Sequence, residues 1–231
     1  MKVDSGRRLL ADCGNTWVKL ALGGDRVRLR ATPDALTGWL AGRPVDELVL
    51  LPGAARSTAV LRAWWSGRRR ELGRDIAVPD LGQYPGLGLD RVLAGVAAGA
   101  DVIVIDAGTA TTLSAWDAQG RFAGGLILPG AHALIAGLVA CAPALPQVVP
   151  LPPDAIAAQR DTRGAMAAAA GISHPAMVAA CLARLRQETG ISRLLATGGG
   201  CPQLASAGTV PADAVRPWLV LNGLGTVAEA G

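Results

Sequence analysis

The chain has few residues that could stack on nucleic-acid bases, because only 3% of its 231 residues are aromatic. The formal net charge is +4, but the basic residues are spread along the sequence. The densest basic run, Arg68 to Arg70, is predicted to end a helix, where cations are favourable. We therefore expect no nucleic-acid partner.

Cysteine and histidine are also scarce, and their spacing excludes several kinds of site. The four cysteines lack the C-x-x-C spacing of metal-binding and thiol-redox motifs. The two histidines, His132 and His174, form no recognisable nucleophilic pair or metal cluster. The N-terminal sequence MKVDSGRR is polar and unlike a secretory signal. These features favour a cytoplasmic location.

Long uninterrupted apolar runs are missing as well. The weakly polar stretch over 124–146 could be mistaken for a membrane span, but Pro129, Pro143 and Pro146 interrupt it. A buried loop followed by a helix is the better interpretation of this stretch. We expect no membrane partner.

Two short segments, DCGNT at 12–16 and DAGTA at 106–110, share one pattern. Each follows an apolar run and leads into another, which predicts a strand, a tight turn and a returning strand. Glycine lets backbone amides approach phosphate oxygens, while a carboxylate and a hydroxyl can hold a hydrated cation. Two copies indicate two similar half-molecules facing one nucleotide, as in a phosphotransferase.

The candidate nucleotide-binding residues lie in these two turns and in the later glycine run TGGG. The chain contains neither G-x-x-x-x-G-K-[ST] nor G-x-G-x-x-G, which disfavours P-loop and dinucleotide-binding folds. Only two of the 22 basic residues are lysines, so Lys19 is a candidate point charge for phosphate, or else a solubilising strand lysine. The candidates are Asp12, Gly14, Asn15, Thr16, Lys19, Gly108, Thr109, Thr112, Gly198 and Gly199.

Hydrophobic periodicity predicts the same order of elements in both halves of the chain. We expect strands at about 8–13, 17–22, 26–31, 47–51 and 75–78, with helices at about 33–41, 57–72 and 91–100. We then expect strands at about 101–106, 111–116, 121–128, 193–197 and 216–221, with helices at 130–141 and 163–189. The repeated order predicts two mixed α/β domains, 1–100 and 101–231, with a cleft between them.

Several motifs, taken in order, resemble the superfamily of acetate and sugar kinases, heat-shock proteins and actin, and within it the type III pantothenate kinase family. The resemblance is carried by LLADCGNTWVKLAL, LGLDR, VIDAGTATTL, GGLILPG and ATGGG, and it extends over residues 9–225. It implies an α/β fold of two duplicated actin-like (ribonuclease H-like) lobes with mixed β-sheets and a nucleotide cleft. It also implies phosphorylation of the 4′-hydroxyl of pantothenate by ATP, the first step of coenzyme A biosynthesis.

The same resemblance implies roles for particular residues. Asp90 of LGLDR would be the catalytic base, although an acid at a helix start can also be a simple cap. Asp12 would bind Mg²⁺, and Asp106 would bind a monovalent cation, K⁺ or NH4⁺. The family also implies a homodimer. The implied substrate contacts are Tyr84, Gly88, Leu89, Asp90, Arg91 and Thr162.

Two alternatives remain open at this point. One is another small-molecule kinase of the superfamily, acting on a sugar or a small acid. The other is a non-catalytic regulatory or ligand-binding protein with the same fold. The presence of acids at positions 12, 90 and 106 favours an enzyme.

Overall fold

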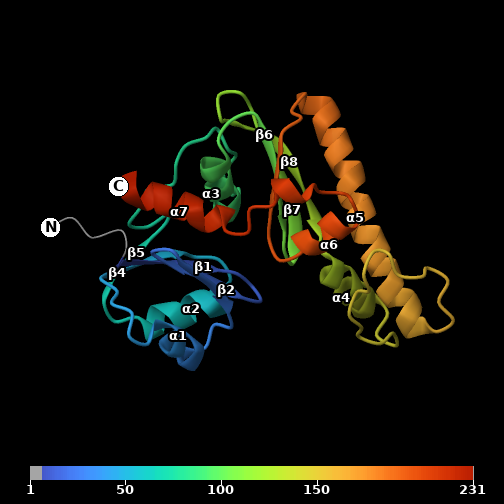
Figure 1. Cartoon of the computed structure of the whole chain (residues 1–231), viewed down its shortest axis with the longest axis horizontal. Coiled ribbons are helices and arrows are strands. Elements are labelled where there is room, and N and C mark those ends of the chain that lie inside the picture. Colours follow the sequence, from blue (N-terminus) through green and yellow to red (C-terminus); the bar gives the residue numbers. More distant parts are fainter. Residues whose placement is uncertain (1–6, 231) are drawn as a thin grey trace. The chain divides into compact units, whose positions relative to one another are not determined.

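A computed structural model describes residues 7–230, which divide into two compact units (Figure 1). The first unit contains the chain up to Ala97 together with the segment from Leu219 onward, and the second spans Ala98–Trp218. This division differs from the expected second domain, 101–231, at its C-terminal end. The reason is packing, because helix α7 (Leu219–Ala230) contacts strands of the first unit.

The first unit is built on a five-stranded mixed sheet. The two hairpin pairings, of β1 with β2 and of β2 with β3, are antiparallel, whereas β1 with β4 and β4 with β5 are parallel. Across the sheet the order is β3 (Asp25–Leu29), β2 (Val18–Leu22), β1 (Arg8–Cys13), β4 (Glu47–Leu51) and β5 (Arg68–Glu71).

Helices cover both faces of this sheet (Figure 1). Leu36 of α1 (Pro33–Leu40) and Leu61 of α2 (Ala55–Trp64) are fully buried in one core with alternate residues of β1, β2 and β4. Helix α7 packs on the opposite face, where Gly225 lies against Leu10. Helix α3 (Leu89–Ala98) approaches α7 so closely that a side chain at Gly223 would collide with the Leu93 carbonyl.

The second unit repeats the same pairing pattern with four strands. Two antiparallel hairpin pairings are again followed by one parallel pairing, of β6 with β9. A core of apolar residues from β6, β7 and the long helix α5 (Thr162–Thr189) lies beside the sheet. Across the sheet the order is β8 (Phe122–Pro129), β7 (Ala110–Trp116), β6 (Val102–Ala107) and β9 (Leu194–Thr197). The duplication predicted from the sequence is thus present.

Helix α5 has clear start and stop signals in its sequence. Asp161 caps its N-terminus by accepting a hydrogen bond from the Gly164 amide at 2.9 Å, and Gly190 ends it in the left-handed region at φ 74°. Within residues 7–230, α5 alone is long and apolar enough to cross a membrane by length and composition. Half of its most apolar window is buried inside the protein, including Val178 and Leu182.

Three sequence-based predictions of secondary structure are wrong. The helix expected over 57–72 ends at Trp64, and the three arginines belong to strand β5. There Arg68 and Arg70 pair with the buried carboxylate of Glu47, and Arg69 pairs with Glu71, which stabilises an arginine-rich strand.

The other two errors concern short apolar runs. The strand expected over 75–78 is reduced to a single bridge between Leu72 and Ile76. The strand expected over 216–221 is also absent, because the single bridge at Val215 is followed by a short turn and then by helix α7, which begins at Leu219. Helix α4 (Ala131–Cys141) of the second unit agrees with the helix expected over 130–141. Two short elements of the same unit, α6 (Cys201–Ser206) and the 3-10 turn Ala212–Ala214, were not predicted from the sequence.

Candidate active site

The first acid turn joins β1 to β2 and places its acid beside a lysine. Asp12 stands opposite Lys19 in the hairpin, and the Lys19 Nζ lies 3.3 Å from Asp12 Oδ2. The Gly14 amide donates to the Asp12 carbonyl at 3.2 Å, and a side chain at Gly14 would lie 2.8 Å from the Trp17 carbonyl. Glycine is therefore required for the tight turn.

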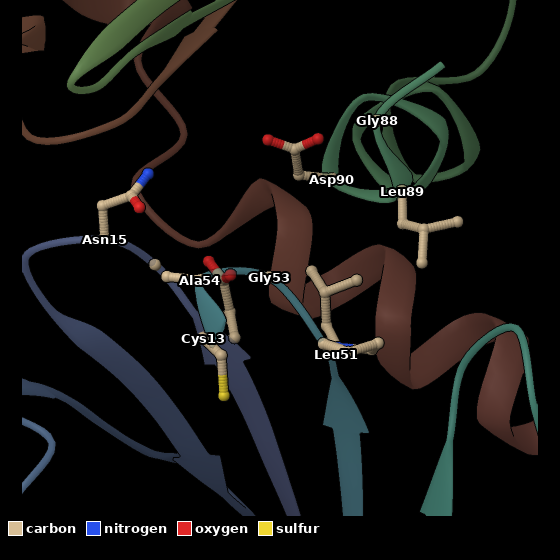
Figure 2. A pocket seen from close by; sticks show the side chains of 11 residues that line it. Cys13, Asn15, Leu51, Gly53, Ala54, Gly88, Leu89 and Asp90 are labelled. Carbon is tan, nitrogen blue, oxygen red and sulfur yellow. The ribbon is translucent and has the colours of Figure 1, made fainter. Parts of the chain in front are cut away.

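A cavity of about 270 Å³ opens over this turn, within the first unit. Figure 2 shows Asp90 extending from the start of α3 toward Asn15, while Leu89 turns toward Leu51. The cavity thus combines two carboxylates and an amide with an apolar side. It is lined by Asp12, Cys13, Gly14, Asn15, Leu51, Pro52, Gly53, Ala54, Gly88, Leu89 and Asp90.

The surroundings of Asp12 disfavour the ionised form of its carboxyl group. Its exposed fraction is only 8%, and burial raises the pKa of its carboxyl, an effect that Lys19 opposes and the Asp90 charge reinforces. A divalent cation near these two carboxylates would relieve their mutual repulsion. Their oxygen atoms are the ligand type that Mg²⁺ prefers, so the donor set fits the cation that the sequence suggested.

The segment before α3 orients Asp90. The Asp90 Oδ1 accepts a hydrogen bond from the Arg91 amide at 2.9 Å, and a side chain at Gly88 would approach that oxygen to 2.5 Å. Asp90 itself is exposed, whereas Arg91 is buried with its Nη1 3.5 Å from the Tyr84 hydroxyl. Of the predicted substrate contacts, Gly88, Leu89 and Asp90 line the cavity, whereas Arg91 and Tyr84 contact each other and are not among its lining residues.

The clasp that holds the first turn in place was not predicted. The Ala54 amide donates to the Cys13 carbonyl at 2.8 Å, and the Ser57 Oγ donates to the Gly14 carbonyl at 2.9 Å. A side chain at Gly53 would lie 2.3 Å from the Cys13 carbonyl oxygen. The Pro-Gly pair directly after the apolar strand 47–51 was the sequence signal that could have identified this clasp.

Cys13 lines the cavity but is not a nucleophile. Its side chain is buried, and burial raises the pKa of the thiol to about 12. Because the thiolate is the reactive form, this cysteine stays protonated and inert at neutral pH.

In the second unit, the structure brings two glycine-containing segments together around the second acid turn. The Gly130 amide donates to the Thr109 carbonyl at 2.9 Å, and the Gly200 amide donates to the Ala107 carbonyl at 2.8 Å. Gly198 has a φ of 96°, and a side chain there would lie 2.5 Å from Asp106 Oδ1. The turn, the end of GGLILPG and the TGGG run therefore form one cluster.

The remaining predicted residues lie near or beyond this cluster. Thr112 stands opposite Asp106 in the β6–β7 hairpin, and Gly108 closes the turn by donating to the Ala110 carbonyl at 3.0 Å. Thr162 begins α5, directly after the capping Asp161. The predicted site residues thus fall into two groups, one in each unit.

The pairing pattern of the sheet, repeated in both units, defines a class, the proteins with a duplicated actin-like fold. The solved structure of an archaeal actin homologue is similar to this chain with a TM-score of 0.52. It is 11% identical in sequence and the alignment covers 97% of this chain and 99% of that one, so the likeness concerns the fold. The predicted fold class is confirmed.

The particular family follows from the sequence relatives. The family model described as type III pantothenate kinase matches residues 54–184. The type III pantothenate kinase of Synechococcus elongatus is 36% identical over 196 residues, covering 83% of this chain and 76% of that protein. The one from Halorhodospira halophila is 35% identical over 257 residues, covering 94% and 96%. The chain belongs to the type III pantothenate kinase family, whose members phosphorylate pantothenate with ATP.

Proposed function

We propose that this chain transfers the γ-phosphoryl group of ATP to the 4′-hydroxyl of pantothenate in the cavity of the first unit, with Asp90 as the general base. The observation that carries the proposal is the exposed Asp90 carboxylate aimed into a cavity whose other side is the Asp12 turn (Figure 2). A carboxylate there can accept the hydroxyl proton as the new oxygen–phosphorus bond forms and the bond to ADP breaks.

Pantothenate binding is assigned to the residues around Asp90. The buried Arg91 directly follows Asp90, its guanidinium lies next to the Tyr84 hydroxyl, and a guanidinium can orient a carboxylate substrate. Gly88 keeps space beside Asp90, and Leu89 offers an apolar contact. Thr162 is proposed as a further substrate contact.

Contacts to nucleotide phosphates are proposed for each acid turn, one unit at a time. In the first, the backbone amides of Gly14, Asn15 and Thr16 and the Lys19 ammonium would neutralise phosphate charge, and Asp12 would hold Mg²⁺. In the second unit, Gly108, Thr109, Thr112, Gly198 and Gly199 are proposed to contact ATP. The cation, when bound, supplies charge compensation for the phosphates, which is most of the catalytic task in phosphoryl transfer.

Asp106 is proposed to hold a monovalent cation, K⁺ or NH4⁺. Its carboxylate lies in a cluster rich in backbone oxygens, because the carbonyls of Ala107, Gly108 and Thr109 all lie beside the glycines that close the turn. A large cation needs several oxygen ligands, so this donor set fits it.

A homodimer is proposed from the surface of the second unit. Strand β8 is at the edge of its sheet and exposes Leu126 and Ile127, the latter to 62%. Helix α4 is apolar but exposes Leu138 among small residues. An apolar sheet edge and an apolar helix face suit a second copy of the chain. We also propose a cytoplasmic enzyme that acts without nucleic acid or membrane.

The direct test is turnover by the purified protein. Pantothenate and ATP should give 4′-phosphopantothenate, detected by mass spectrometry, whereas common sugars and acetate should not be phosphorylated. Asp90→Asn should lower kcat by about 100-fold or more while the protein still folds. A wild-type rate in Asp90→Asn would remove Asp90 as the base, and phosphorylation of a sugar in place of pantothenate would reassign the substrate.

A further inference from the structure

The sheet face that carries Asp12 continues into a row of arginines at the edge of the first unit. In the strand register, Asp12 stands opposite Lys19, and Lys19 stands opposite Arg28 on edge strand β3. Because side chains alternate along a strand, Arg26, Arg28 and the following Arg30 share this face. Positive charge therefore extends from the first acid turn toward the sheet edge.

Arg28 and Arg30 converge on the indole of Trp17, the residue that follows the turn. The guanidinium carbon lies 4.2 Å from the ring centroid for Arg30 and 5.1 Å for Arg28. The Arg30 Nη1 also donates to the Thr16 carbonyl at 3.2 Å. Ring and turn together fix Arg30 at the rim of the phosphate turn, and most of its N–H donors remain for a ligand.

Among residues 7–230, no carboxylate forms an ion pair with Arg28 or Arg30. Most arginines of the first sheet's far edge form ion pairs, such as Arg70 with Glu47, but neither Arg28 nor Arg30 takes part in an ion pair of the described residues. Lys19 is matched by Asp12. The two guanidinium groups on this ring repel each other. A bound anion would attract both groups and so offset their repulsion.

We propose that Trp17, Arg28 and Arg30 form a phosphoryl-binding subsite at the rim of the first phosphate turn. The proposal rests on the proposed function, because the turn supplies the position of the phosphates. A planar guanidinium held by an aromatic ring binds a phosphate through two parallel N–H donors, which a lysine cannot do. The phosphoryl group belongs either to the polyphosphate chain of the nucleotide or to the phosphomonoester product.

The first measurement is the binding of inorganic tripolyphosphate to the purified full-length protein by calorimetry. Arg30→Gln is expected to weaken this binding about tenfold, because one charge-assisted contact is lost. Arg26→Gln is the matched control, since it removes the same charge from strand β3, which Arg30 directly follows. Arg26 instead bonds the Gly23 carbonyl and Asn222, away from the turn, and its loss is expected to change binding by less than about twofold.

Two kinetic measurements distinguish the sources of the phosphoryl group. If the subsite binds the nucleotide, Arg30→Gln raises KM for ATP about tenfold; if it binds the product, inhibition by 4′-phosphopantothenate weakens by a similar factor and KM for ATP is unchanged. Trp17→Leu keeps both charges but removes the ring, and it should give an intermediate loss of about threefold. Circular dichroism melting establishes that each variant is folded.

Either kinetic result supports the subsite. It is overturned if Arg30→Gln matches the wild type in all three measurements, or if Arg26→Gln loses as much as Arg30→Gln. A wild-type protein that does not phosphorylate pantothenate would contradict the proposed function, but tripolyphosphate binding by the two variants would still decide for or against the subsite.

Discussion

The two units contain the same turn but differ in the residue opposite its acid. In the first unit, Asp12 stands opposite Lys19, and the two side chains form an ion pair. In the second, the equivalent Asp106 stands opposite Thr112. The first turn therefore has the ammonium group of a lysine beside its carboxylate, whereas the second has a hydroxyl that can help to hold a cation from solution. A single cross-strand position thus distinguishes the two turns and underlies the different roles that we propose for them.

The surroundings of the two turns differ as well. The first turn is clasped by Gly53 and Ala54 but opens onto the cavity that Asp90 faces. The second turn is approached by Gly130 and Gly198, whose missing side chains let backbone pack directly against it. The first turn is thus open on the side that Asp90 faces, whereas backbone packs against the second turn.

The largest expected effect comes from replacing the carboxylate of each acid turn by an amide. Asp12→Asn should lower kcat by about a thousandfold, because it removes the proposed Mg²⁺ ligand beside the transferred phosphate. Asp106→Asn should lower kcat by about tenfold to 100-fold and abolish the response to potassium. Steady-state rates measured while Mg²⁺ and K⁺ are titrated separately would test both expectations. A potassium response that is lost in Asp12→Asn and kept in Asp106→Asn would reverse the two assignments.

Thermal melting provides the control for Asp12→Asn. Because burial raises the pKa of Asp12, folding favours its protonated form, and the ionised carboxylate costs stability at neutral pH. A neutral amide of the same shape should therefore leave the melting temperature unchanged or raise it, even though Lys19 loses its ion pair. A large fall in melting temperature would show that the lost activity reflects unfolding rather than the lost ligand.

The sequence was sufficient to predict both acid turns, because their signals are local. Each turn lies between two apolar strands, and each contains a glycine where the backbone leaves no space for a side chain, as at Gly14. The register that places Lys19 beside Asp12 then follows from the short hairpin. The family resemblance added Asp90, whose position between the halves no local pattern would have linked to the turns.

The errors arose where long-range contacts decide the structure. Arg68 to Arg70 resemble a helix end, but as β5 they pair with Glu47 and Glu71, and burial of those carboxylates requires the charges. The apolar run of α7 suits a strand or a helix equally well. Gly53 contacts the carbonyl of Cys13, which is distant in the sequence, so the clasp can be recognised only from the three-dimensional structure.

A smaller effect is expected from adding a methyl group at Gly53, where the loop after β4 packs against the first turn. Gly53→Ala would place a methyl group 2.3 Å from the Cys13 carbonyl oxygen, which forces the turn or the loop to shift. We expect a loss of about 2 kcal/mol in the free energy of unfolding, measured by urea denaturation, together with reduced activity. Gly24→Ala is the control, because nothing lies within 4 Å of its added methyl. Equal stabilities of the two variants would contradict the clasp.

The smallest expected effect is a pH-dependent loss of stability in the second unit, because both histidines lie in that unit. His174 is buried, its Nε2 lies 2.9 Å from the Thr111 Oγ1, and burial lowers the pKa of its imidazole below the ordinary 6.5. Between the folded and unfolded pKa values the unfolded state binds more protons, so stability is present above pH 6.5 and is lost as the pH falls below it. The expected loss is about 1 kcal/mol between pH 7 and 5.5.

Hydrogen exchange resolves this loss by unit, since peptides from α5 and from α2 report on different cores. Protection of α5 should fall between pH 7 and 5.5, after correction for the intrinsic exchange rate, while protection of α2 should not. His174→Gln keeps a hydrogen-bonding group for Thr111 but does not titrate, so the pH dependence of α5 should flatten. The exposed His132 is the matched control, and His132→Gln should behave like the wild type. A fall in protection that persists in His174→Gln, or that is equal in α2, would assign the pH dependence to other groups.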